Sequence, residues 1–149
     1  MRQKKNNKGF SLVELIVVIA IMIVLVAVLA PVFTKYVEQS RRATDVQNAN
    51  TISQAILVGV TDGETITKDA WTEVTASTTD GIKSVPAVKG KEVDSGKFFY
   101  YYNSTDNVVK VCIAKDAASA SDTGKKGVCS GNLTDDTKTE AYKNSELAQ

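Results

Sequence analysis

The sequence predicts an α+β fold in which one long N-terminal helix packs against a small antiparallel β-sheet. Three observations predict it. An apolar run extends from Leu15 to Phe33, and an amphipathic pattern follows it directly to Val60. Two strand-prone runs come later, at residues 97–103 and 108–113, separated by the polar loop "STDN". Helical periodicity followed by strand-prone runs is typical of this fold class.

The apolar run contains no charged and no hydrogen-bonding side chain. Its length is sufficient for a helix to cross the hydrocarbon core of a membrane. Small residues within it (Ala20, Ala27 and Ala30) allow close approach of other helices. Pro31 predicts a kink, or a short melted stretch between Ile23 and Pro31, with a gentle bend as the alternative.

Basic residues gather before the apolar run: Arg2, Lys4, Lys5 and Lys8. The whole chain has a formal charge of +1, and without residues 1–9 the remaining 14 basic and 17 acidic side chains give −3. This distribution fits a cytoplasmic N-terminus with the polar part outside. It offers no basic surface for nucleic acid.

Glu14 distinguishes this N-terminus from an ordinary anchor. A cleaved secretory signal would end at Val28-Leu29-Ala30, and Pro31 would then begin the mature chain, which disfavours that interpretation. No Cys follows the run, so a lipoprotein anchor is excluded. A plain single-pass anchor stays possible, but it does not explain an acidic side chain that costs about 3 kcal/mol within an apolar helix.

The stretch "GFSLVELIVVIAI", residues 9–21, strongly resembles the N-terminus of type IV pilins. The resemblance implies a basic leader that ends at Gly9, cleavage between Gly9 and Phe10 by a prepilin peptidase, and N-methylation of Phe10. Glu14 matches the acidic residue of that family. The close match covers about the first quarter of the chain, and beyond Pro31 the likeness is one of architecture only.

The chemistry of Glu14 agrees with the resemblance. Cleavage would leave an amine on Phe10, four residues or about one helical turn away from Glu14. A carboxylate buried among apolar helices is tolerated only when it is paired. We expect the amine of a neighbouring subunit to be its partner, which makes the pair a device that sets the register of assembly. The alternative is a carboxylate solvated at the headgroup level.

After Phe33 the pattern becomes amphipathic. Apolar or small residues recur at steps that suit one helix face: Val37, Ala43, Val46, Ala49, Ile52, Ile56 and Val60. We expect one helix from about Phe10 to about Val60, about 75 Å long. The early charged residues are expected to cover its surface: Lys35, Glu38, Arg41, Arg42 and Asp45.

The predicted organisation has five parts: leader 1–9, hydrophobic membrane or filament-core helix 10–33, amphipathic helix 34–60, variable loop 61–95, and sheet with C-terminal loop 96–149. Asp62-Gly63 predicts a turn. Within the loop we expect a short helix at Lys68–Val74, anchored by Trp71, and a short strand at Ile82–Val85. A third strand is expected near Gly127–Ser130.

The two strand-prone runs predict a hairpin. Phe98, Tyr100 and Tyr102 would share one face, with Phe99 and Tyr101 on the other. One face should pack on the amphipathic helix. An aromatic patch used for adhesion or conduction is the alternative use of this cluster.

Cys112 and Cys129 are the two cysteines, and an even count outside the cytoplasm predicts a disulfide. A buried free thiol at Cys112 is the alternative. The chain contains no His, which removes the commonest catalytic base and metal ligand, so no catalytic residue, cofactor or metal is expected. Several carboxylates could bind calcium, but their spacing matches no defined loop and solvated side chains are the preferred interpretation: Asp62, Glu64, Asp116, Asp122, Asp135 and Asp136.

The resemblance implies a major pilin, a non-enzymatic subunit that forms a helical homopolymer at the cell surface. Such pili serve attachment, aggregation and biofilm formation, and twitching motility. The implied partners are the prepilin peptidase, the assembly and retraction ATPases, the platform protein, and the cytoplasmic membrane before assembly. A pseudopilin of a type II secretion or competence DNA-uptake system is the alternative, and a membrane-tethered binding or enzymatic domain is a third interpretation from another class.

Overall fold

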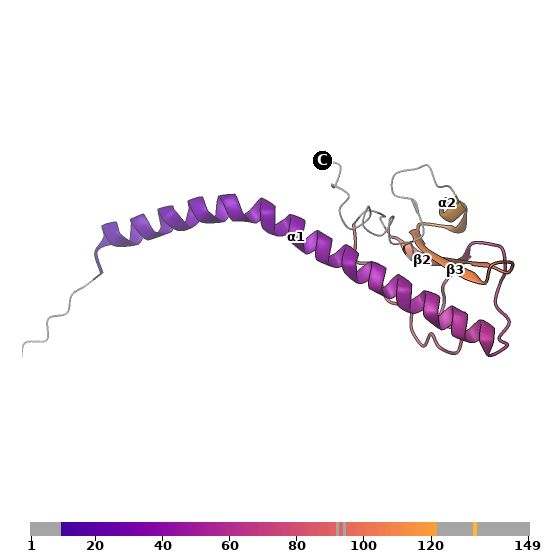
Figure 1. The fold of residues 1–149 in the computed structure, drawn as a ribbon. Helices are drawn as coiled ribbons and strands as arrows, with labels where there is room; N and C mark the ends of the chain where they lie inside the picture. Colours follow the sequence, from indigo (N-terminus) through magenta and orange to yellow (C-terminus); the bar gives the residue numbers. More distant parts are fainter. Residues whose placement is uncertain (1–9, 92, 94, 122–132, 134–149) are drawn as a thin grey trace, which may run out of the picture. The chain divides into compact units, whose positions relative to one another are not determined.

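The computed structural model describes residues 10–91, 93, 95–121 and 133. The chain divides into two compact units, Met1–Val37 and Glu38–Gln149. Five elements follow one another along the chain: α1 (Leu12–Thr61), β1 (Thr72–Glu73), β2 (Lys97–Asn103), β3 (Val108–Ala114) and α2 (Ala117–Ser121) (Figure 1). This order confirms the predicted α+β class, with one long N-terminal helix and a small antiparallel sheet.

Helix α1 has 50 residues and is helical at every position from Leu12 to Thr61. Phe10, where we expected it to begin, lies outside the helix. At its end the N–H of Gly63 donates to the carbonyl of Val60 (3.3 Å), and that of Glu64 to the carbonyl of Gly59 (2.9 Å). Gly63 has a φ of 84°. The left-handed conformation of Gly63 and these two hydrogen bonds end the helix. The turn predicted at Asp62-Gly63 is thereby confirmed.

Pro31 lies inside α1 without interrupting it. Proline has no N–H to donate to the carbonyl of Ala27, so one helical hydrogen bond is missing there. The hydroxyl of Thr34 donates to the carbonyl of Pro31 at 2.9 Å. The expected melted stretch at Ile23–Pro31 is therefore wrong for this structure, because every residue of it is helical. The kink stays a prediction.

The sheet of the second unit has the strand order β1-β2-β3, and both pairs are antiparallel. The β2–β3 hairpin pairs Lys97 with Ala114 and Asn103 with Val108, and the pairs between them follow in register. This confirms the predicted hairpin. Its aromatic and β-branched residues suit a pleated surface that is covered on both faces.

The third strand of the sheet is β1, so the short helix expected at Lys68–Val74 is wrong. The segment runs beside β2: the N–H of Asp69 donates to the carbonyl of Tyr102 (2.8 Å), and the N–H of Val74 to the carbonyl of Phe98 (2.9 Å). These bonds satisfy an otherwise open strand edge. The third strand expected at Gly127–Ser130 lies outside the described residues.

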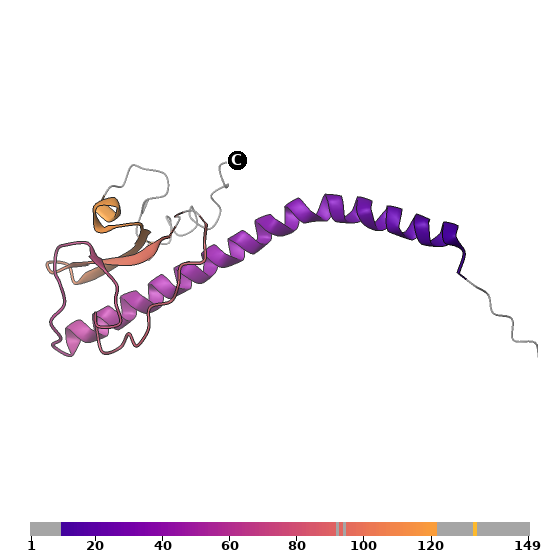
Figure 2. The ribbon, with the colours of Figure 1, turned by 180° about the vertical axis from the view of Figure 1, so that it is seen from behind.

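The hydrophobic core lies between α1 and one face of the sheet, as predicted for Phe98, Tyr100 and Tyr102. These three side chains pack with buried residues of the helix, β3 and the loop: Val46, Ala49, Ile52, Ile56, Ile66, Val74, Ile82, Val109, Val111, Ile113 and Leu133. Figure 2 shows α1 alongside this sheet from behind. Ala43, expected on the buried face, is exposed.

The opposite face of the sheet carries a smaller cluster of Phe99, Cys112, Ala114 and Ala120, with Trp71 packed against it. The rings of Trp71 and Tyr101 lie 5.6 Å apart and are tilted by 48°. Ala120 belongs to α2, so the sheet lies between α1 and α2 (Figure 1). The predicted packing role of Trp71 is confirmed.

Candidate assembly site

The candidate assembly site is the start of α1. Ser11 precedes the helix, and its N–H donates to Oε2 of Glu14 at 2.9 Å. The N–H of Leu15 donates to the carbonyl of Ser11 at 3.2 Å. Ser11 therefore occupies the N-cap position and Glu14 the third helical position, the spacing of a capping box. A negative side chain is also favourable near the positive end of the helix dipole.

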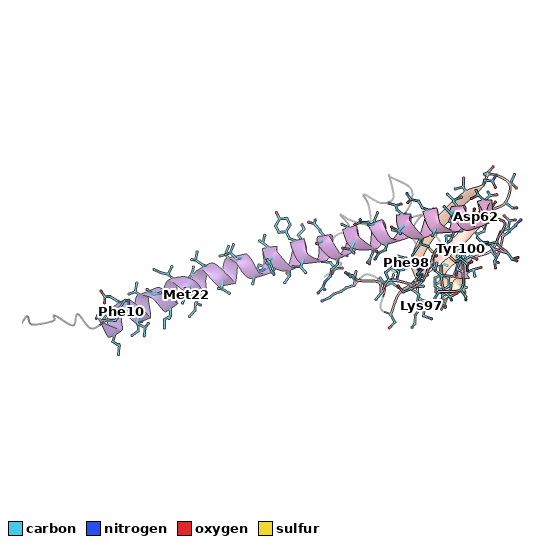
Figure 3. The ribbon with its side chains drawn as sticks, turned by 90° about the horizontal axis from the view of Figure 1, so that it is seen from below. Phe10, Met22, Asp62, Lys97, Phe98 and Tyr100 are labelled. Atoms are coloured by element: carbon cyan, nitrogen blue, oxygen red, sulfur yellow. The ribbon has the colours of Figure 1, made fainter. Side chains whose placement is uncertain are left out.

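Apolar side chains surround the helix downstream of Glu14. From Phe10 to Phe33 the large ones are exposed, with exposed fractions from 44% at Ile19 to 79% at Phe10. In Figure 3 side chains project from the helix on several sides around Met22. Helix α1 is long and apolar enough to cross a membrane, by length and composition. A helix that is apolar on all sides needs either lipid or other helices around it.

The predicted processing site lies at the edge of the described residues. Gly9 falls outside them, whereas Phe10 is described and is not helical. Glu14 and Phe10 lie on the same short stretch, as the sequence requires. The cleavage itself, the methylation of Phe10 and the pairing of its amine stay predictions.

A separate group of charged side chains lies on α1 within the second unit, and we call it the loop clamp: Glu38, Arg42 and Asp45. All three are buried, with exposed fractions of 5%, 2% and 0%. We expected these side chains to cover the surface of the helix, and that expectation is wrong. They lie on the same face as Ala49, Ile52 and Ile56, because the steps from Glu38 onward are four, three, four, three and four residues.

The loop clamp holds part of the irregular segment that follows β1. Asp45 accepts the N–H of Lys89 at 2.8 Å and that of Gly90 at 2.6 Å. Glu38 accepts the N–H of Lys91 at 2.7 Å. Three successive backbone N–H groups thus donate to two carboxylates. Charged acceptors make these hydrogen bonds stronger than neutral ones.

Arginines neutralise part of the clamp's negative charge. Nε of Arg42 lies 3.4 Å from Oε1 of Glu38, and Nη1 of Arg41 lies 3.8 Å from Oε2. Among the described residues, Oε2 of Glu38 is the one buried side-chain oxygen without a hydrogen-bond donor. Glu38 is therefore satisfied mainly through Oε1, and Asp45 is the fully bonded carboxylate of the clamp.

Two further carboxylates fix the loop at other places. Glu64 accepts the N–H of Asp80 at 3.3 and 3.2 Å through its two oxygens. Asp69 accepts the hydroxyl of Ser104 at 2.6 Å and its N–H at 3.1 Å. These two hydrogen bonds hold the pKa of Asp69 below its ordinary value, the hydroxyl contributing most.

The loop from Thr61 to Gly96 is thus ordered mostly by side chains. Besides β1 it has no strand among its described residues, so the strand expected at Ile82–Val85 is wrong. Ile82 instead enters the core as a single buried side chain, and its N–H donates to the carbonyl of Thr79 at 3.1 Å. A local turn satisfies its backbone in place of a partner strand.

The remaining predicted site residues are the two cysteines and the carboxylates considered as calcium ligands. Cys112 is fully buried on β3, and no described cysteine is a free thiol. Its predicted partner, Cys129, lies outside the described residues, so the pairing stays a prediction. Asp62, Glu64 and Asp116 are described, but Asp122, Asp135 and Asp136 are not. Among the described residues no group of three potential metal ligands comes together.

Comparison with known proteins gives two matches. Residues 4–30 match the family described as the prokaryotic N-terminal methylation motif. This segment, the exposed apolar helix and the helix-and-sheet fold support the interpretation of the chain as a type IV pilin.

Similarity to one particular protein supports the same interpretation. Over 69 residues the chain is 36% identical to the type IV major fimbrial protein FimA of Dichelobacter nodosus. The match covers 46% of this chain and 43% of that relative, so the similarity spans less than half of either protein. No solved structure matches the chain.

Proposed function

We propose that this chain is a major pilin, a structural subunit that polymerises into extracellular type IV pili and performs no chemistry itself. The observation that carries the proposal is the apolar surface of residues 10–33, which is exposed on all sides and bears one acid, Glu14, near its start. Such a surface requires a membrane before assembly and other copies after it. The similarity to a major fimbrial protein supports a pilus subunit over a secretion-machine pseudopilin.

Processing precedes assembly in this proposal. A prepilin peptidase removes residues 1–9 by cutting after Gly9, and the new amine of Phe10 is methylated. Before cleavage and assembly, the basic leader lies in the cytoplasm and the second unit lies outside, which fits the charge distribution. An assembly ATPase and a platform protein then move the subunit from the membrane into the pilus, and a retraction ATPase can return it.

Glu14 sets the register of the polymer. Every processed subunit brings one amine, on Phe10, and one carboxylate, on Glu14. A neighbouring subunit placed at the correct stagger brings the two together, whereas a wrong stagger leaves a charge without a partner among apolar side chains. Leaving such a charge unpaired costs about 3 to 5 kcal/mol, which is sufficient to select one arrangement.

The loop clamp has a separate role in the proposed subunit. Pilus subunits must present the same surface to each neighbour, and a loop without regular secondary structure is a poor candidate for that unless it is fixed. Asp45 and Glu38 fix residues 89–91 on the helix. We therefore infer that the loop is an ordered contact surface of the pilus, used for packing between subunits, for attachment and for aggregation.

The distribution of the protein between filaments and membranes tests this function. Cells that express the chain are sheared, and filaments and membranes are separated and probed for it. A major pilin is expected to be the most abundant polypeptide of the filament fraction. A tethered domain would stay with the membranes. Absence of the chain from the sheared material would therefore contradict the proposal.

A further inference from the structure

The exposed face of α1 within the second unit is almost free of charge, although 23% of the residues of the chain are charged. Residues 46–61 contain no charged side chain at all. Among the charged residues that precede them in this unit, Glu38, Arg42 and Asp45 are buried and Arg41 is partly exposed. A helix face that only contacts water usually carries charged side chains, so this face calls for another explanation.

The exposed residues of this face form one stripe along the helix. They recur at steps of three or four residues, which places them on one side of a helix. We call them the outer stripe: Ser40, Ala43, Gln47, Asn50, Gln54 and Val58. Val58 is 57% exposed although it is apolar. This spacing is the one with which a helix presents side chains to a second helix.

The polar groups of the outer stripe suit contact with an identical chain. The hydroxyl of Thr51, beside the stripe, donates to the carbonyl of Gln47 at 3.0 Å, so it is satisfied within the helix. The amides of Gln47, Asn50 and Gln54 have no hydrogen-bond partner within the part of the chain that the structure describes. Each amide both donates and accepts hydrogen bonds, so identical copies can satisfy one another. No like charges would meet between them.

A cavity of about 300 Å³ borders the outer stripe. Asn48, Thr51 and Ala55 of α1 form one wall, and residues 81–84 of the loop form part of the other. A cavity of this size can hold a small ligand, so it has room for a single side chain. The surface beside the stripe is therefore concave, as is the hole that receives a side chain of a packed helix.

We propose that the outer stripe packs against α1 of a second copy of this chain in the pilus. This contact rests on the proposed function, because it requires a polymer. It extends the contact between copies beyond the apolar surface of residues 10–33, along the same helix as far as Val58. The absence of charge then has a cause, because a charge on the stripe would lose its water in the polymer without gaining a partner.

The filament yield of two variants at one position tests this contact. Gln54→Lys places a charge on the outer stripe, and it is expected to lower the yield of sheared filaments by about tenfold or more, because an unpaired charge is costly in an interface. Gln54→Met is the matched control, since it has a similar length and no charge, and it should keep most of the yield. Lys, Met and Gln have similar helix propensities, so the fluorescence of Trp71 should show unchanged folding in both variants. Wild-type yield from Gln54→Lys would overturn the contact.

The reactivity of a cysteine at the same position is a second measurement. Filaments of Gln54→Cys are treated with a membrane-impermeant maleimide before and after dissociation in detergent, and the labelling of residue 54 is followed by mass spectrometry. Labelling is expected to be about tenfold slower in intact filaments, because a buried thiol reacts only when the contact opens. Equal labelling in both would overturn the contact and leave the proposed function standing. Absence of the wild-type chain from sheared filaments would overturn both.

Discussion

Replacing Glu14 by Gln is expected to leave the chain in the membrane and to reduce its assembly into filaments by more than tenfold. Gln has the same shape and can still accept the N–H of Ser11, so the helix start is preserved. It has no charge to pair with the amine of a neighbouring Phe10. The loss of a close charged pair at an interface costs about 2 to 5 kcal/mol, and each 1.4 kcal/mol is a tenfold change in affinity.

The measurement compares the amount of the chain in sheared filaments with the amount in membranes. Glu73→Gln is the matched control, because it makes the same chemical change in the second unit, where Glu73 forms an exposed ion pair with Lys97 at 2.7 Å. An exposed pair of this kind contributes little, so Glu73→Gln should assemble normally. Wild-type filament yield from Glu14→Gln would contradict the role of the charge.

Replacing Asp45 by Ala is expected to lower the free energy of unfolding of the second unit by about 3 kcal/mol. Asp45 is fully buried, and its removal leaves the N–H groups of Lys89 and Gly90 without their acceptor. Each buried donor left without a partner costs about 1 to 3 kcal/mol. Asp45→Asn keeps one carbonyl oxygen of the same reach, and it should therefore lose less than Asp45→Ala.

Denaturant unfolding of the full chain in detergent measures this effect. The chain has a single tryptophan, Trp71, and it packs against the sheet. Its fluorescence therefore reports on the unit in question. Asp62→Ala serves as the control, because Asp62 is exposed. If the midpoint of Asp45→Ala matched that of Asp62→Ala, the loop clamp would not contribute to stability.

Much of the fold could be predicted because its strongest patterns are local. The apolar run gave the first half of α1, and the aromatic and β-branched runs gave the hairpin. Glu14 was recognised because a charge inside an apolar run has few explanations. These features depend on neighbours within one element, so the sequence order contains them directly.

The loop could not be predicted in the same way, because tertiary contacts decide it. Thr72–Glu73 became a strand since the edge of β2 needed partners for its backbone. Glu38 and Asp45 are buried against the backbone of residues 89–91, which lie more than 40 residues away. One signal was nevertheless present: Glu38, Arg42 and Asp45 continue the spacing of the apolar stripe through Ala49, Ile52 and Ile56.

The N-terminal residue of the polypeptide in sheared filaments tests the central claim most directly. Filaments are purified from cells that express the unmodified chain, and the mass and N-terminal sequence of their main polypeptide are determined. The account predicts a chain that begins at a methylated Phe10, because the amine paired with Glu14 exists only after cleavage behind Gly9. Filaments built from chains that begin at Met1 would contradict it.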